Sequence, residues 1–283
     1  MTPFGQDPLV STEWLAAHLG EPDLRVVDAT FYLPHLKRDA RAEFEQAHLP
    51  GAVFFDIETI SDHANPLPHM LPDARDFAHA VGALGLGTGD RVVAYGGRGL
   101  IASARVWWTF RVFGHERVAV LDGGSTKWKK EGRSVESGVP SPPRRSFAAT
   151  PHKELVADLD RVLATLERRD AQIIDARSRG RFAATEPEIR PGVRGGHIPG
   201  SLSLPYNELF SADDDVLRPD ADVHGAFQGA GLDLARPVVA TCGSGVSAAV
   251  LALAMYRLGR RDAAVYDGSW SEWGGRGDTP IAP

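Results

Sequence analysis

A chain of 283 residues is long for one hydrophobic core and suits two domains of about 140 residues each. The net charge of −6, without a dense Lys/Arg block, argues against nucleic acid or an anionic membrane as the main partner. A single cysteine excludes an intrachain disulfide and a multi-cysteine metal site, and it suits a reducing compartment such as the cytoplasm. The first residues lack a basic and an apolar region, and no apolar run approaches 18 residues, so we expect no signal peptide and no membrane span.

Strand and helix patterns alternate along the first half of the chain. Short apolar, β-branched runs predict strands, and longer amphipathic segments between them predict helices. The predicted strands are 24–28, 52–55, 91–95 and 118–121, and the predicted helices are 11–19, 38–47, 72–84, 100–113 and 125–130. This βαβα order predicts an α/β fold with a central parallel sheet flanked by helices.

The same unit occurs twice. Four blocks of the first half return in the same order in the second half, at offsets of 145–149 residues. The matched landmarks are Asp28 with Asp175, His48 with His197, Gly96 with Cys242, and Asp122 with Asp267. We therefore predict tandem domains at 1–136 and 153–283, joined by a Pro-rich linker at 137–152 that lies on the surface.

The second copy carries the cysteine in an unusual place. Residues 238–241 predict a buried strand, and a small, apolar helix follows from residue 246. Between them stand Cys242, Gly243, Ser244 and Gly245, and the glycines allow a tight turn that aims backbone N–H groups into one concavity. A thiol at the start of that helix is biased toward thiolate, the nucleophilic form.

The first copy has Gly96 at the matched position, so its loop lacks a nucleophile. Residues 97–102 there also fit the G-x-G-x-x-A pattern of dinucleotide-binding proteins. That pattern should follow the first strand of its unit, whereas two predicted strands precede it here. Duplication of the cysteine loop explains these glycines, and we expect the first domain to support the second.

The run Cys242 to Ala248 resembles the active loop of the 3-mercaptopyruvate sulfurtransferases, a two-domain family of the rhodanese superfamily. The resemblance implies two rhodanese-like domains and a persulfide on Cys242. It also implies that the loop from Gly243 through Gly245, Val246 and Ser247 cradles the outer sulfur. Family members usually carry threonine where this chain has Ser247, and this exchange keeps a hydroxyl.

The resemblance also assigns a donor clamp and a proton relay. Arg181 and Arg190 have the spacing of the family's pair that binds the donor's carboxylate and carbonyl oxygens, and a guanidinium suits a carboxylate. Ser244, His69 and Glu58 match the proposed relay of the family. Asp56 precedes Glu58 by two residues, so which carboxylate orients His69 stays open.

The reaction that the resemblance implies needs no cofactor or metal. Cys242 takes sulfur from 3-mercaptopyruvate, pyruvate leaves, and a thiol (thioredoxin among the candidates) or cyanide accepts the sulfur. Thiosulfate is the competing donor, but thiosulfate-specific relatives carry cationic residues where Gly243 and Ser244 stand. A cysteine phosphatase needs an arginine six residues after the cysteine, where Ala248 stands. A non-enzymatic persulfide carrier or binding module remains the alternative from another class.

Overall fold

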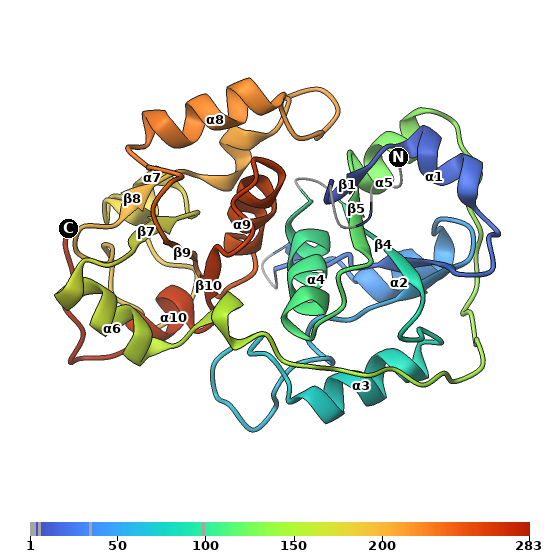
Figure 1. Ribbon diagram of the computed structural model, residues 1–283, viewed down its shortest axis with the longest axis horizontal. Helices are drawn as coiled ribbons and strands as arrows, with labels where there is room; N and C mark the ends of the chain where they lie inside the picture. Colours follow the sequence, from blue (N-terminus) through green and yellow to red (C-terminus); the bar gives the residue numbers. More distant parts are fainter. Residues whose placement is uncertain (1–3, 5–6, 34–35, 98–99) are drawn as a thin grey trace. The chain divides into compact units, whose positions relative to one another are not determined.

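The computed structural model describes residues 4, 7–33, 36–97 and 100–283 (Figure 1). They form two compact units, each built mainly from one half of the sequence. Unit 1 contains residues 1–62, 71–152 and 211–216, and unit 2 contains residues 63–70, 153–210 and 217–283. Each half therefore contributes one short segment to the other unit. The domain boundaries at 136 and 153 stay a prediction.

Unit 1 has a five-stranded sheet in the order β1-β5-β4-β2-β3, in which every described pair of strands is parallel. Its strands are β1 (Leu9–Val10), β2 (Leu24–Asp28), β3 (Ala52–Phe54), β4 (Arg91–Tyr95) and β5 (Val118–Leu121). Its helices are α1 (Thr12–His18), α2 (Ala40–Gln46), α3 (Ala74–Ala83), α4 (Ile101–Val112) and α5 (Gly124–Lys130).

Unit 2 repeats this arrangement with the strand order β6-β10-β9-β7-β8. Its strands are β6 (Val156–Ala157), β7 (Gln172–Asp175), β8 (Leu202–Ser203), β9 (Val238–Thr241) and β10 (Ala264–Tyr266). Its helices are α6 (Leu159–Arg168), α7 (Arg179–Phe182), α8 (Asp220–Gly229), α9 (Ala248–Arg257) and α10 (Ser269–Trp273), with short 3₁₀ turns η3 (Lys153–Leu155) and η4 (Tyr206–Leu209). The two parallel sheets flanked by helices confirm the predicted fold.

Side-chain hydrogen bonds cap the amino ends of several described helices. Asp73 caps α3 by accepting a hydrogen bond from the Asp76 N–H, so the helix begins at Ala74 and the predicted Pro72 lies before the cap. The edge strands β1 and β6 were not predicted, because two residues are too few to show an alternation. Of the glycine pattern at 97–102, Arg98 and Gly99 lie outside the described residues.

The linker is fixed to unit 1 along its length. Arg145 donates from its N–H to the Gly82 carbonyl at 2.9 Å, and its guanidinium pairs with the buried Asp90. Phe147 is buried among Phe77 and Phe110, with edge-on ring contacts to both. Three kinds of contact therefore hold this segment, which is consistent with a semi-rigid connection.

Candidate active site

The loop from Cys242 to Ser247 lies at the carboxyl end of β9, between that strand and α9 (Figure 1). Cys242 is buried, with 2% of its surface exposed. Gly245 has a φ of 72°, in the left-handed region that glycine adopts without a Cβ clash. The carboxyl edge of an open parallel sheet is where such folds bind ligands, so the loop occupies the expected functional edge.

The hydroxyl of Ser269 anchors this loop through hydrogen bonds. Its oxygen accepts hydrogen bonds from the Cys242 N–H at 3.2 Å and from the Gly245 N–H at 3.0 Å, and it donates to the Tyr266 carbonyl at 2.7 Å. It also lies 4.0 Å from the Cys242 sulfur. Ser269 is fully buried, with a left-handed φ of 49°. Its role was not predicted, although it follows the repeated Asp-Gly block.

Other N–H groups of the loop remain available as donors. Among the described residues, no carbonyl or side chain accepts a hydrogen bond from the N–H of Gly243, Ser244, Val246 or Ser247. Ser247 makes no side-chain cap of α9, and Val246 is buried. Unpaired N–H groups at a helix start attract negative charge, so these four groups stay candidates for the predicted sulfur cradle, whereas the N–H of Gly245 already donates to Ser269.

The register between β7 and β9 brings a second loop beside the cysteine. Asp175 lies opposite Thr241, and the Ala176 N–H donates to the Thr241 carbonyl at 2.9 Å. Arg177, the next residue, has no exposed side-chain surface, pairs with Asp175 at 2.7 Å and lies 4.2 Å from the centre of the Trp270 ring. Arg177 is therefore a buried, paired arginine.

Arg181 lies directly over the cysteine loop. A Cβ on Gly243 would come within 3.1 Å of Arg181 Nη2, which is closer than most Cβ contacts, so the missing side chain gives the guanidinium its room. The Arg181 Nε and Nη2 groups both donate to Glu188 Oε2, at 3.1 and 2.5 Å. Arg190 is half-buried on the same loop. Glu188 was not predicted as a site residue, although an acid between two candidate arginines was an available signal.

His69 contacts the same loop. Its Nδ1 shares a hydrogen bond of 3.1 Å with the Ser244 hydroxyl, and both side chains are buried. His69 has a φ of 61°, an unfavourable conformation for a non-glycine residue that the surrounding contacts must maintain. The segment 63–70 belongs to unit 2, although it precedes the linker by about 70 residues. The structure thus joins His69 and Ser244.

The two candidate acids belong to unit 1. The Asp56 carboxylate accepts hydrogen bonds from the Glu58 N–H at 3.0 Å and from the Thr59 hydroxyl at 2.8 Å, so it stabilises the turn after β3. Glu58 has an exposed side chain. The assignment of either acid as the partner of His69 stays a prediction.

Comparisons with known proteins show which family the chain belongs to. The rhodanese-like domain family matches residues 11–131 and 158–276. The human 3-mercaptopyruvate sulfurtransferase is 43% identical over 94% of this chain and 91% of that protein. The chain belongs to the rhodanese family. The crystal structure of SseA from Escherichia coli, described as a 3-mercaptopyruvate sulfotransferase, matches with a TM-score of 0.86 and 38% identity over 93% of this chain and 99% of that chain.

A relative named for another donor is equally similar. The thiosulfate sulfurtransferase of Cricetulus griseus is 43% identical over 94% of this chain and 91% of that protein. Overall identity therefore does not separate the two sulfur donors, and the distinction must come from residues at the site.

The paired histidines of the two rhodanese-like domains have a local role. His48 Nδ1 lies 2.7 Å from the Phe44 carbonyl and its ring stacks on Phe44. His197 Nδ1 lies 3.0 Å from the Phe182 carbonyl and its ring stacks on Phe182. The same packing in both domains indicates a structural role for the two histidines.

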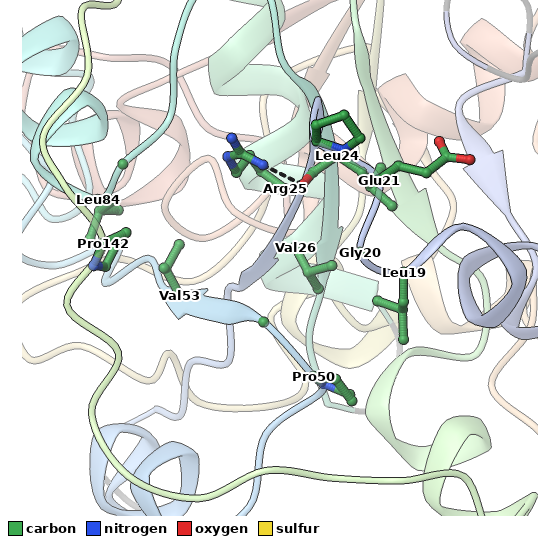
Figure 2. Close-up of a pocket in the computed structure, with 13 residues that line it drawn as sticks. Leu19, Gly20, Glu21, Leu24, Arg25, Val26, Pro50, Val53, Leu84 and Pro142 are labelled. Carbon is green, nitrogen blue, oxygen red and sulfur yellow. Dashed lines mark hydrogen bonds between the residues drawn. The ribbon is translucent and has the colours of Figure 1, made fainter.

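The first rhodanese-like domain has a cavity at the amino-terminal edge of its sheet. It has a volume of about 470 Å³ and is lined at the amino ends of β2 and β3, among others by Arg25, Pro50 and the linker's Pro142 (Figure 2). Ligands of open α/β sheets bind at the opposite, carboxyl edge. Among the described residues, no group of three or more His, Cys, Asp or Glu could hold a metal ion, and no helix there could span a membrane.

Proposed function

We propose that this rhodanese is a 3-mercaptopyruvate sulfurtransferase that carries sulfur as a Cys242 persulfide. One observation carries the proposal: the Arg181 guanidinium lies over Gly243, the residue next to the buried Cys242. The loop of residues 242–247 itself has no cationic side chain. A carboxylate donor needs one such cation beside the thiol, whereas a dianion such as thiosulfate would favour more positive charge.

The first half-reaction follows from these groups. The Cys242 thiolate attacks the donor sulfur, so an S–S bond forms and the C–S bond breaks. The electron pair of the C–S bond goes to pyruvate as its enolate, which takes up a proton. The loop N–H groups share the negative charge that develops on sulfur. Arg181 and Arg190 hold the carboxylate and carbonyl oxygens of the donor.

The buried pair of His69 and Ser244 is the candidate for proton handling. Ser244 directly follows Gly243, the residue over which Arg181 lies. Its hydroxyl is 3.1 Å from His69 Nδ1. A positioned proton donor typically contributes about 10²–10⁴-fold to the rate of such a step. Glu58, or in its place Asp56, completes the proposed relay.

The second half-reaction transfers the outer sulfur to an acceptor thiol or to cyanide and restores Cys242, a ping-pong scheme. Thioredoxin is the proposed physiological acceptor, because a dithiol can release the sulfur and leave a disulfide. We also infer a cytoplasmic location, which the single cysteine of the chain supports.

The decisive experiment compares donors on the same enzyme. Steady-state kcat/KM should be larger for 3-mercaptopyruvate than for thiosulfate, with cyanide and then thioredoxin as acceptors. Intact-mass measurement after donor treatment should show one added sulfur atom on Cys242. A larger kcat/KM for thiosulfate would make the protein a thiosulfate sulfurtransferase, and a stable persulfide without turnover would make it a carrier.

A further inference from the structure

Glu188 connects two arginines of the catalytic rhodanese-like domain through one carboxylate. Its Oε1 accepts from Arg177 Nη1 at 2.7 Å, and its Oε2 accepts from Arg181 Nε and Nη2 at 3.1 and 2.5 Å. Its side chain is 4% exposed. A carboxylate so deeply buried is retained only when it is paired, and here both oxygens are used.

The two arginines differ in their freedom to move. Arg177 is fully buried and also bound to Asp175 and to the Gly196 carbonyl, so it forms a fixed anchor. The Arg181 side chain is 17% exposed. Within the described chain its guanidinium donates to Glu188, and its Nη2 group lies over Gly243. Glu188 therefore holds the accessible Arg181 at a fixed place relative to the buried Arg177.

This arrangement also decides which edge of Arg181 can meet a ligand. A guanidinium presents a side edge (Nε and Nη2) and an end edge (Nη1 and Nη2), and either edge can bind a carboxylate with two parallel hydrogen bonds. Glu188 takes the side edge. Within the described residues, Arg181 Nη1 donates to no acceptor, so the end edge stays open for an anion.

We propose that Glu188 is a positioning residue that holds the side edge of Arg181 so that its end edge binds the donor carboxylate beside Cys242. The inference rests on the proposed function, because it takes Arg181 as a donor ligand. It predicts that removing the Glu188 charge weakens donor binding more than it slows sulfur transfer, since the nucleophile and the N–H cradle are untouched.

Glu186 provides a matched control on the same loop. It lies two residues before Glu188 and has an exposed side chain, and it accepts a hydrogen bond from Ser178 at 2.5 Å. Glu186→Gln removes the same charge from the same loop without touching either arginine. Any effect of net charge or of loop flexibility should therefore appear in both variants.

The test measures persulfide formation in a single turnover as a function of 3-mercaptopyruvate concentration, which separates apparent donor Kd from the limiting rate. Glu188→Gln should raise Kd about 10- to 100-fold, the loss expected for one charged hydrogen-bonding contact, with a limiting rate close to that of the wild type. Glu188→Asp should behave alike, because the shorter side chain cannot reach both arginines. Glu186→Gln should keep the wild-type Kd.

Two further readouts identify the route of the effect. Added to Arg181→Ala, Glu188→Gln should cause no further rise in Kd, because both act on the same contact. Modification by phenylglyoxal, mapped by mass spectrometry, should become faster at Arg181 in Glu188→Gln and unchanged in Glu186→Gln. This second readout needs no catalysis.

The outcomes separate the inference from the proposed function. An unchanged Kd in Glu188→Gln, a further rise in Kd on the Arg181→Ala background, or unchanged modification at Arg181 would overturn the positioning role. A wild-type enzyme that forms no persulfide from 3-mercaptopyruvate would instead overturn the donor assignment, and the modification experiment would still decide whether Glu188 holds Arg181.

Discussion

The loops at the carboxyl edge of the two sheets differ in their chemistry. In the second, Cys242 follows β9 and Ser269 supplies a hydroxyl beneath the loop. In the first, Gly96 follows β4, and Gly124 stands where Ser269 does. A Cβ on Gly124 would lie 2.5 Å from the Gly96 carbonyl oxygen, so this loop sits too close to accept a serine. Duplication kept the fold, and the loop contacts diverged.

The strand that neighbours each loop diverged in the same way. β2 and β7 both end in a buried aspartate whose oxygen accepts from the N–H two residues later, at Thr30 and at Arg177. In the second domain the Arg177 guanidinium neutralises Asp175. In the first, burial raises the pKa of Asp28, although hydrogen bonds from Thr30 and Tyr95 oppose this rise. Matched substitutions should therefore have unequal effects.

The largest difference concerns the nucleophile. Cys242→Ser should abolish sulfur transfer with the fold intact, because a hydroxyl is a far weaker nucleophile toward sulfur. A Cβ on Gly96 would find its nearest neighbour at 3.8 Å, so Gly96→Cys should be tolerated. Intact-mass measurement after donor treatment should show no added sulfur in the Cys242→Ser/Gly96→Cys double variant. A persulfide on the thiol introduced by Gly96→Cys would mean that the first domain retains a working site.

The next effect is on stability at the matched aspartates. Asp175→Asn should lower the free energy of unfolding by about 3–5 kcal/mol, because it leaves the fully buried Arg177 without its main counter-charge. Urea unfolding followed by circular dichroism measures this loss. A loss below about 1 kcal/mol would show that Glu188 alone compensates Arg177.

A smaller loss should follow removal of the Ser269 hydroxyl. Ser269→Ala leaves the buried N–H groups of Cys242 and Gly245 without an acceptor, which costs about 1–3 kcal/mol of stability. Persulfide formation should also slow, since the loop that carries the nucleophile loses its support. Ser269→Gly, which copies the first domain, should show the same kinetic loss but a smaller loss of stability, because glycine relieves the strain of the left-handed φ at this position. Wild-type kinetics in both variants would remove Ser269 from the site.

The smallest expected change is a gain in stability, at Asp28. Asp28 has a raised pKa in the folded protein, so its ionised form is disfavoured there and it lowers stability above its folded pKa. Asp28→Asn should slightly raise the urea midpoint at neutral pH. The difference from wild type should shrink as pH falls through the folded pKa towards the ordinary carboxyl value of about 3.9, where the aspartate is neutral in both states. If Asp28→Asn were less stable than the wild type at pH 7, the charge of Asp28 would stabilise the folded protein and the prediction would be wrong.

The sequence by itself determined the tandem α/β fold, the loop with Cys242 and the missing nucleophile of the first domain. These features depend on local patterns: apolar runs that predict strands, glycines that permit tight turns, and a repeat that exposes Gly96 opposite Cys242. They could be predicted because each is set by neighbouring residues in the chain.

Only the tertiary structure decided which side chains meet at the loop. Ser269 reaches Cys242 across 27 residues, and His69 reaches Ser244 across 175. Glu188 was unrecognised because its role depends on Arg177, which the register of β7 on β9 carries to the cysteine. Such contacts are set by parallel strand pairing and by loop packing at one sheet edge, and sequence spacing does not encode them.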